Sequence, residues 1–342
     1  MILRTAATFA TALFLSFAAA VAQDLKIYNW EDYTAPELIQ KFQRETGVRV
    51  SLETYQSNEE LLAKLRSGTG DYDLVVPTQN VIETMVREGL LQKVHVHEMA
   101  NFKNIDERWR KPSWDPKQEY SAPWHWGTAS FAYRVDLYSG NGSSLREYFE
   151  PRPEVKGRLQ VLSSPDETIN LAHIYLGTEI CSEDQATMLK VRDLLLRQKE
   201  SVLLYSNQRT RQRIAIDEII MTGIWRGDAL RARLEDNPQV RYALPKEGVV
   251  GWFDSLVVPT GAKNVETARA FMNFAMDPGN MAIQSNFSKY ANAIPASSPF
   301  LGPELKDARE LHVPADLPVR FSVACSQKAQ RLVEDIWSAV VP

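Results

Sequence analysis

The chain has 342 residues, a formal net charge of −4 and a charged fraction of 24%. A chain of this length can bury a large core, and it is more often divided into two lobes than folded as one. The hydrophobic fraction of 44% is ordinary for a soluble globular protein. The mild acidity argues against nucleic acid as an obligatory partner.

The first 22 residues have the pattern of a secretory signal peptide. Arg4 precedes an apolar run, and Ala20-Val21-Ala22 forms an A-x-A cleavage pattern. A membrane anchor is disfavoured because the run barely reaches the length of a bilayer span. No cysteine near the cleavage point offers a lipid attachment site. In the oxidising compartment that secretion implies, Cys181 and Cys325 can form a disulfide, but only geometry can decide whether they do.

Residues 25–37 join a predicted strand to a predicted helix, and the functional prediction depends on them. Leu25–Asn29 alternates as a strand, whereas Thr34 and Glu37 form a capping box for a helix with Pro36 in its first turn. Residues 30–33, W-E-D-Y, lie between them, at the carboxyl end of the strand. Ligands bind at that edge in open α/β sheets. Aromatic rings and carboxylates together favour an organic cation, which predicts a secreted binding protein for a small amine.

The remaining N-terminal third continues as alternating strands and helices. Gly47 ends the first helix, residues 48–52 form a strand, and a capping box of Ser57 and Glu60 opens the next helix. Residues 73–77 are a short apolar run typical of a strand covered on both faces, and Thr78 can cap a third helix that Gly89 ends. This order predicts a mostly parallel sheet with right-handed crossovers.

A long strand at residues 121–134 then crosses to a second α/β pattern. We expect strands at 159–162, 202–205, 240–244 and 255–259, and helices at 167–176, 185–197, 211–222, 265–276 and from 327 onward. Two α/β lobes joined by crossing strands fit this order better than two independent domains.

Six motifs in register give the chain a strong resemblance to one family. They are I-Y-N-W-E-D-Y at 27–33, F-x-x-E-T-G-V at 42–48, S-N-E at 57–59, Y-D-L-V-V-P at 72–77, L-P-K-E-G at 244–248 and W-F-D-S at 252–255. Along nearly the whole mature chain, the sequence resembles the spermidine/putrescine-binding proteins of polyamine ABC importers.

The resemblance implies a fold, a function and a location. The fold would be the α/β, two-lobed periplasmic binding protein fold (type II, flytrap) with mostly parallel central sheets. Its discontinuous lobes would be residues 24–128 plus 250–294, and 129–249 plus 295–342. The protein would be a periplasmic monomer without cofactor, metal or enzymatic activity. It would capture a putrescine- or spermidine-like ligand between the lobes and deliver it to an inner-membrane permease.

The family's amine-facing positions match residues scattered along this chain. Flat aromatic rings can line the methylenes of a polyamine, and carboxylates can replace the water that its ammonium groups lose. For any single tryptophan, core packing is the commoner fate. Alternation in Trp252-Phe253-Asp254 places Trp and Asp on one strand face, which suits a cleft wall. The resemblance implies ligand contacts from Trp30, Glu31, Tyr33, Thr78, Glu167, Trp225, Asp228, Trp252, Asp254 and Tyr290.

Three departures from the family pattern bear on the ligand. Ser163 and Ser164 stand where relatives commonly have an Asp, and Glu31 replaces the usual Ser or Thr after Trp30. After L-V-V-P, where many members have Ser and then an aromatic, Thr78 is followed by Gln79 and Asn80. Relative to that pattern, one carboxylate is lost from lobe two and one is gained in lobe one. We hypothesise that the ammonium positions have moved and that the ligand preference differs from the usual putrescine or spermidine.

The basic residues and histidines admit more than one interpretation. For Arg209, Arg211, Arg213 and Arg226, a solvated surface or a contact with the transporter is favoured. The alternative is that one of them enters the cleft and either neutralises a carboxylate or receives an anionic group, in which case it would weaken the binding of a simple diamine. His95-Val96-His97 would place two imidazoles on one strand face, a metal pair in principle. A solvent-facing loop pair is favoured instead, and His125 is interpreted as structural.

Two other function classes remain. The same fold can bind a neutral or zwitterionic solute, such as a sugar, an amino acid derivative or an opine-like compound. An enzyme with paired carboxylates, such as a glycosidase, is disfavoured because the sequence has no G-x-S-x-G, H-E-x-x-H or phosphate-loop motif.

Overall fold

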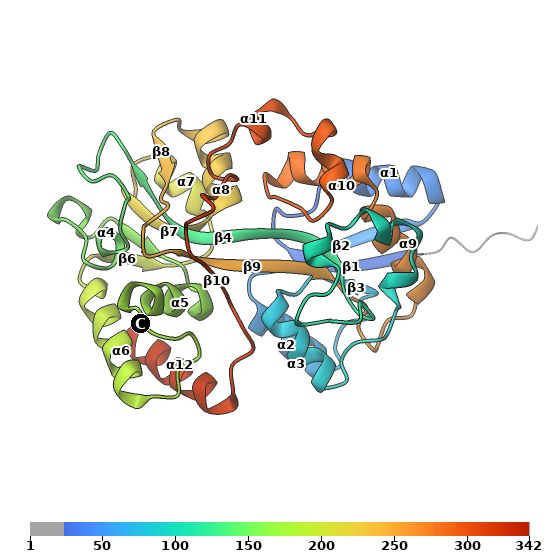
Figure 1. Ribbon diagram of the computed structural model, residues 1–342, viewed down its shortest axis with the longest axis horizontal. Coiled ribbons are helices and arrows are strands. Elements are labelled where there is room, and N and C mark those ends of the chain that lie inside the picture. Colours follow the sequence, from blue (N-terminus) through green and yellow to red (C-terminus); the bar gives the residue numbers. More distant parts are fainter. Residues whose placement is uncertain (1–23, 342) are drawn as a thin grey trace, which may run out of the picture.

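The computed structural model describes residues 24–341, so the signal peptide predicted for residues 1–22 lies outside the described residues. The molecule has two α/β halves, and two long strands run between them (Figure 1). These strands are β4 (Ala122–Arg134) and β9 (Val249–Leu256), which pair antiparallel. Within residues 24–341, no helix combines the length and the apolar character needed to cross a bilayer.

The first half is built on a parallel sheet with the strand order β2-β1-β3. The strands are β1 (Asp24–Trp30), β2 (Arg49–Tyr55) and β3 (Leu74–Val75). The helices around them are α1 (Pro36–Thr46), α2 (Asn58–Arg66), α3 (Gln79–Arg87), α9 (Val265–Ala275) and α10 (Pro278–Ser288). The predicted alternation of strands and helices is confirmed.

The second half is built on a larger, mixed sheet with the order β10-β9-β4-β7-β5-β6, and β8 also pairs with β4. Its remaining strands are β5 (Leu159–Val161), β6 (Val202–Tyr205), β7 (Met221–Trp225), β8 (Val240–Tyr242) and β10 (Val319–Phe321). Its helices are α4 (Arg146–Phe149), α5 (Pro165–Leu176), α6 (Gln185–Lys199), α7 (Thr210–Ala215), α8 (Arg226–Arg231), α11 (Pro303–Lys306) and α12 (Gln327–Val340).

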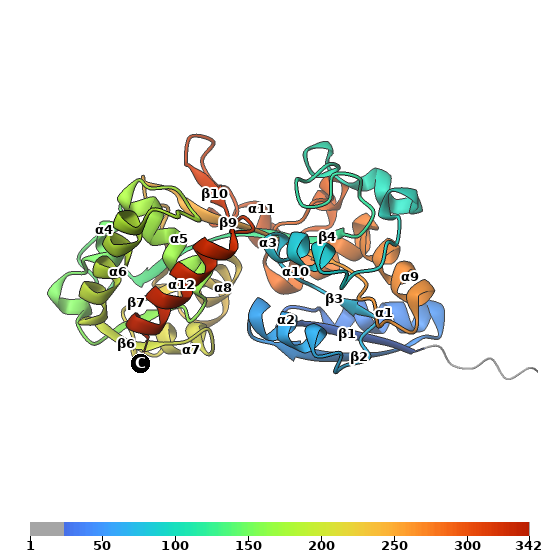
Figure 2. The same cartoon turned by 90° about the horizontal axis from the view of Figure 1, so that it is seen from below.

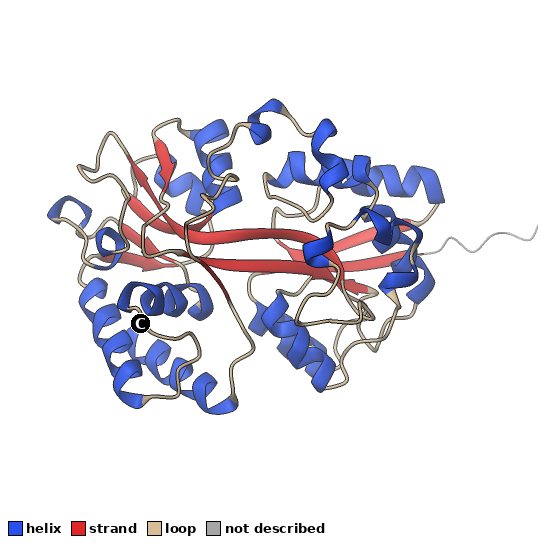
Figure 3. Cartoon of the chain, in the orientation of Figure 1, coloured by secondary structure: helices blue, strands red, loops and turns tan. Residues whose placement is uncertain are grey.

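Helices cover both faces of the strands (Figure 3). The C-terminal helix α12 packs beside α5 and α6, which come much earlier in the sequence (Figure 2). Buried apolar residues form one cluster from 25–105, 122–124 and 252–294, and a second from 129–250, 336 and 340. The chain therefore crosses between the halves more than once, although the lobe boundaries stay a prediction.

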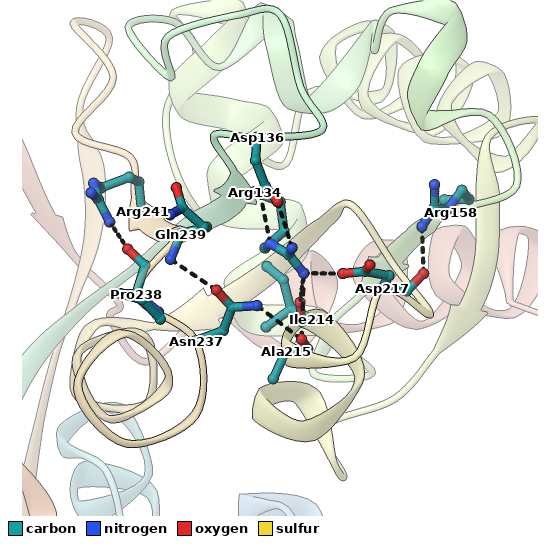
Figure 4. Close-up of polar contacts among 10 residues, drawn as sticks. All are labelled: Arg134, Asp136, Arg158, Ile214, Ala215, Asp217, Asn237, Pro238, Gln239 and Arg241. Carbon is teal, nitrogen blue, oxygen red and sulfur yellow. Dashed lines mark hydrogen bonds and ion pairs between the residues drawn. The ribbon is translucent and has the colours of Figure 1, made fainter.

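The helix predicted for residues 211–222 is wrong in its second half. Helix α7 ends at Ala215, and Met221–Trp225 forms β7, a buried strand between β4 and β5. The turn between them is fixed by Arg134, a buried side chain that pairs with Asp136 and Asp217 and donates to the carbonyl oxygens of Ile214 and Ala215 (Figure 4). Tertiary pairing in the centre of the sheet therefore ends the helix early.

Two predicted helix caps use their hydroxyl groups elsewhere. Helix α1 begins at Pro36, but its N-cap is Ala35, and Thr34 Oγ1 accepts a 2.7 Å bond from Asn29. Thr78 precedes α3 without capping it by its side chain. Ser57, in contrast, caps α2 by accepting from the Glu60 backbone N–H, as predicted.

Cys181 and Cys325 form a disulfide, with 5.2 Å between their Cα atoms. The bond joins the segment between α5 and α6 to the segment that leads into α12. The question that the sequence left open is thus answered by geometry.

Candidate ligand-binding cleft

A cleft with about 350 Å³ of open space lies between the two halves. It brings together all the ligand contacts expected from the sequence, although they are spread over more than two hundred and fifty residues of chain. The residues from the list above that line it are Trp30, Glu31, Tyr33, Thr78, Glu167, Trp225, Asp228, Trp252, Asp254 and Tyr290.

Asp254 is the most enclosed carboxylate of this set. Only 5% of the residue is exposed, and it accepts hydrogen bonds from the hydroxyls of Tyr33 (2.9 Å) and Thr78 (2.8 Å). Burial raises the pKa of Asp254 to about 7, although these two donors favour the charged form. Trp252 lies on the same face of β9, as the alternation predicted, and Phe253 packs against Trp109 on the other side. A cation that reaches Asp254 would restore its charge.

Aromatic rings form a continuous wall beside Asp254. Trp252 and Tyr290 meet edge to face with ring centroids 5.1 Å apart, and Tyr33 meets Tyr290 in the same way at 5.6 Å. The indole N–H of Trp30 donates a 2.9 Å hydrogen bond to the Val76 carbonyl oxygen, which fixes the ring. The indole N–H of Trp225 donates a 3.2 Å hydrogen bond to the Glu167 carboxylate. The wall is therefore preorganised by contacts within the protein.

A second acidic group lies at the start of α5 and includes one residue that sequence reasoning missed. Asp166 lines the cleft next to Glu167, and Asn80 of α3 donates to Asp166 at 2.8 Å from the other half. The pKa of Glu167 is raised to about 8, mainly by burial and to a smaller extent by the charge of Asp166. The pKa of Asp166 is raised to about 6, mainly by burial and to a smaller extent by the charge of Glu59. Asp166 therefore offsets the carboxylate absent at Ser163 and Ser164. The adjacent acids in the D-E pair after Pro165 were its sequence signal.

Of the other acids in the cleft, Glu31 and Asp32 are exposed, whereas Asp228 is half-buried. Glu31 lines the cleft. Its carboxylate, which the sequence comparison identified as an addition to the first lobe, accepts a 2.7 Å hydrogen bond from the side-chain amide of Gln56 and is thereby held in place. Asp32 lines the cleft beside it. Burial raises the pKa of Asp228, while the charges of Arg231 and Arg211 partly oppose that rise.

The sequence profile of the bacterial extracellular solute-binding proteins matches residues 37–313. The chain belongs to this family. The spermidine/putrescine-binding periplasmic protein of Escherichia coli is 31% identical over 90% of this chain and 89% of its own length. The putrescine-binding periplasmic protein PotF of the same species is 29% identical, covering 94% of this chain and 92% of its own. The family recognised from the six motifs is thus confirmed.

Solved structures give the same answer for the fold. A spermidine/putrescine ABC transporter protein from Listeria monocytogenes superposes with a TM-score of 0.87 at 27% identity, covering 93% of this chain and 99% of its own. Together with the two sheets described above, this likeness confirms the two-lobed periplasmic binding protein fold. We refer below to the two halves of this solute-binding protein as its lobes.

Arginines enter the cleft, contrary to the favoured expectation of a solvated surface. Arg209 and Arg211 both line it. Arg211 is neutralised by Glu235 and Asp236, at 2.9 Å each. The side chain of Arg209, in contrast, makes no hydrogen bond or ion pair with any residue between 24 and 341. Arg231, which the sequence did not single out, also lines the solute-binding cleft.

Arg213 and Arg226 do not line the cleft, but for different reasons. Arg213 pairs with Glu218 at 3.2 Å. Arg226 is fully buried, donates 2.9 Å to the Trp126 carbonyl oxygen and stacks over the Trp126 ring at 4.3 Å. Burial without a carboxylate partner lowers the pKa of Arg226 to about 10. It is thus neither the surface residue nor the cleft residue that the sequence suggested.

His125 is buried and has a structural environment in this solute-binding protein. Its ring lies 3.1 Å from the Ala291 carbonyl oxygen and 2.9 Å from the Ser288 hydroxyl. Burial lowers its pKa to about 3, so the ring is neutral at physiological pH. His95 and His97 lie at the start of a 3-10 turn at Val96–Glu98, where His97 is exposed and His95 half-buried, which agrees with the favoured loop pair and not with a strand.

Proposed function

We propose that this chain is the periplasmic binding component of an ABC importer and that its ligand is a polyamine of the putrescine or spermidine kind. The observation that carries the proposal is the enclosed Asp254, held by Tyr33 and Thr78 beside the rings of Trp252 and Tyr290. The relatives named for spermidine and putrescine binding support the same ligand class.

The chemistry of the cleft suits a chain of methylenes with ammonium ends. Each ammonium over an aromatic face would gain about 0.5–2 kcal/mol, depending on how far it is desolvated. Asp254 would hold one ammonium, and Asp166 with Glu167 would hold another, because each of these carboxylates lacks a lysine or arginine partner among the described residues. Trp252, Tyr290 and their neighbours would line the methylenes between them.

Ligand capture would favour closure of the two lobes. Asp254 lies on β9 with partners from the first lobe, whereas Asp166 and Glu167 begin α5 in the second. In the empty cleft, acids such as Glu59 and Asp166 repel each other across the lobe boundary. A dication removes this repulsion and touches both lobes at once, so it binds the closed form more tightly and shifts the population toward it. The closed monomer would then deliver its ligand to an inner-membrane permease.

One observation favours a second candidate ligand. The unpaired guanidinium of Arg209 at the cleft can receive a carboxylate, which a simple diamine lacks. The same fold with the same aromatic wall could then bind a zwitterionic amine, such as an ω-amino acid or an opine-like compound. Both candidates place an ammonium at Asp254 and differ only in the group at the other end.

A thermal-shift and calorimetry panel tests the proposal. We expect putrescine, cadaverine or spermidine to stabilise the protein by about 2.7 kcal/mol at one hundred times its dissociation constant. The zwitterion 4-aminobutanoate, and glucose as a neutral control, should give smaller shifts at the same concentrations. Stabilisation by the zwitterion alone would support the second candidate, and stabilisation by glucose alone would contradict both.

A further inference from the structure

A cluster of metal-ligating side chains lies outside the cleft, on the segment that follows α3. The possible ligand atoms of His95, His97 and Glu98 all lie within 4.8 Å of one another. The two imidazole rings are 5.9 Å apart and nearly perpendicular, at 86°. His97 Nε2 is 3.8 Å from the Glu98 carboxylate. None of the three lines the cleft, so this cluster is separate from the solute site.

The backbone that carries the cluster is held in place. Val94 and Val96 alternate with the two histidines and are 1% and 0% exposed, so they anchor the segment in the interior. The backbone N–H groups of Val94 and His95 donate to the Glu119 carbonyl oxygen at 2.8 and 2.9 Å. The three ligand side chains therefore project from a fixed backbone, which is the condition for a preorganised site.

The backbone of His95 is strained. It has φ 49° and ψ 58°, in the left-handed region that residues other than glycine rarely adopt. Such a conformation is found more often at functional sites than elsewhere. Here it begins the turn at Val96–Glu98, which brings His97 and Glu98 next to the His95 ring.

The hydrogen bonds of the rings leave nitrogen lone pairs for a metal. His97 Nδ1 lies 3.2 Å from the Gln118 carbonyl oxygen. Because a carbonyl oxygen only accepts, Nδ1 carries the proton, and Nε2 presents its lone pair toward Glu98. This is the arrangement that orients histidine ligands in metal sites. The side chain of His95 makes no hydrogen bond within the described chain, so a ring nitrogen is free to coordinate.

The lysine nearest to the cluster in sequence has its charge paired. Lys93 is two residues before His95, but its ammonium pairs with Glu119 at 2.9 Å. Glu98 is exposed, and within residues 24–341 its side chain contacts only His97, so its carboxylate is available as a third ligand. The remaining coordination positions would face solvent and hold water.

We infer that His95, His97 and Glu98 bind one divalent transition-metal ion of the Zn²⁺ class. Two imidazoles and one carboxylate suit Zn²⁺, Ni²⁺ and Cu²⁺, whereas Ca²⁺ and Mg²⁺ prefer all-oxygen sites. The sequence had favoured a loop pair without a metal because two histidines alone make a poor site. The turn supplies what that pattern lacked, a third ligand and a carbonyl that fixes the tautomer.

Equilibrium dialysis of the tag-free, EDTA-treated protein against ZnCl₂ at pH 7.5, with metal quantified by mass spectrometry, tests the inference. We expect one equivalent of Zn²⁺ in the wild type and at least about a tenfold loss of affinity in His95→Gln and in His97→Gln. Glu98→Gln should give a smaller loss. Excess Mg²⁺ or Ca²⁺ should not compete, because both ions prefer all-oxygen sites.

The control is His312→Gln, which removes an exposed histidine that is not part of the cluster and should leave Zn²⁺ binding unchanged. Thermal unfolding of the metal-free variants checks that they are folded. An equivalent of Zn²⁺ retained by the double variant His95→Gln/His97→Gln would overturn the inference. So would a wild type that takes up no Zn²⁺ at ~100 µM, a concentration at which even a solvent-exposed three-ligand site should fill. Either result leaves the proposal for the cleft untouched.

Discussion

The Tyr33 hydroxyl donates a 2.9 Å hydrogen bond to Oδ2 of Asp254, a residue 221 positions further along the chain. Tyr33 follows β1, and Asp254 lies within β9, one of the two strands that run between the lobes. The bond therefore ties the end of the first strand to a strand that continues into the second lobe. A ligand ammonium at Asp254 would act at this junction.

Asp254→Asn should weaken polyamine binding strongly. The substitution keeps the shape of the side chain but removes the charge that would pair with an ammonium. Because a hydrogen bond to a charged group contributes about 1.5–3 kcal/mol, we expect the Kd for putrescine to rise roughly 10- to 150-fold. Isothermal titration measures the change. Asp316→Asn, at an exposed position away from the cleft, is the matched control and should leave the Kd unchanged.

The raised pKa values of the cleft acids predict that ligand-free stability depends on pH. The pKa of Glu167 is raised from 4.5 to about 8 and that of Asp254 from 3.8 to about 7. At a pH between the unfolded and the folded pKa of each group, the folded protein binds more protons than the unfolded chain. The two groups therefore make the free energy of unfolding fall as pH rises from about 4 to about 8. Glu167→Gln should flatten this fall in Tm between pH 5 and 8. An identical pH profile in wild type and variant would contradict the assignment.

The pH dependence of binding should run in the opposite direction. Below pH 7, protonated Asp254 and Glu167 offer no charge to an ammonium, so affinity for putrescine should rise with pH from 5 to 8. Binding should also release protons. Titrations in buffers of different ionisation enthalpy measure that release, and its absence would indicate that these acids do not contact the ligand.

The cleft was largely predictable because local patterns place some of its residues and the resemblance to the polyamine-binding family supplied the others. Alternation puts Trp252 and Asp254 on one face of a strand, and the end of β1 puts Tyr33 at the ligand-binding edge of the sheet. What the sequence could not give are relations between distant segments. Asp166 enters the cleft because α5 approaches Asn80 of the other lobe, and Met221–Trp225 is a strand because β4 and β5 flank it. Neither relation leaves a periodic signal in the sequence.

Glu31→Ser tests whether the ligand preference of this chain differs from that of its relatives. The Glu31 carboxylate is oriented by Gln56 and lines the cleft. Its removal should change the ranking of affinities among putrescine, cadaverine, spermidine and spermine, because one ammonium position loses its partner. Glu37→Ser, an exposed position on α1 that does not line the cleft, is the control. An unchanged ranking would show that the added carboxylate does not set the preference.

The disulfide between Cys181 and Cys325 should contribute strongly to stability. It closes a loop with a sequence separation of 144 residues, and loops of that size lose much chain entropy when they are cross-linked. Cys181→Ser/Cys325→Ser should lower the free energy of unfolding by about 2–5 kcal/mol. Urea denaturation measures this change. Putrescine affinity should be retained, because neither cysteine lines the cleft.

Arg209→Gln separates the two candidate ligand classes. Arg209 is an unpaired cation at the cleft, so its charge should repel a diamine and attract a carboxylate. If the natural ligand is a polyamine, the variant should bind putrescine a few-fold more tightly, and its weak binding of 4-aminobutanoate should not improve. If the ligand is a zwitterion, the variant should lose affinity for it by roughly tenfold, the size of one exposed charge-assisted contact of about 1.4 kcal/mol.

Arg213→Gln, at a residue whose side chain pairs with Glu218 outside the cleft, is the matched control. Equal effects of the two substitutions would show that the charge at Arg209 acts only as part of the protein's general field and not on the bound solute.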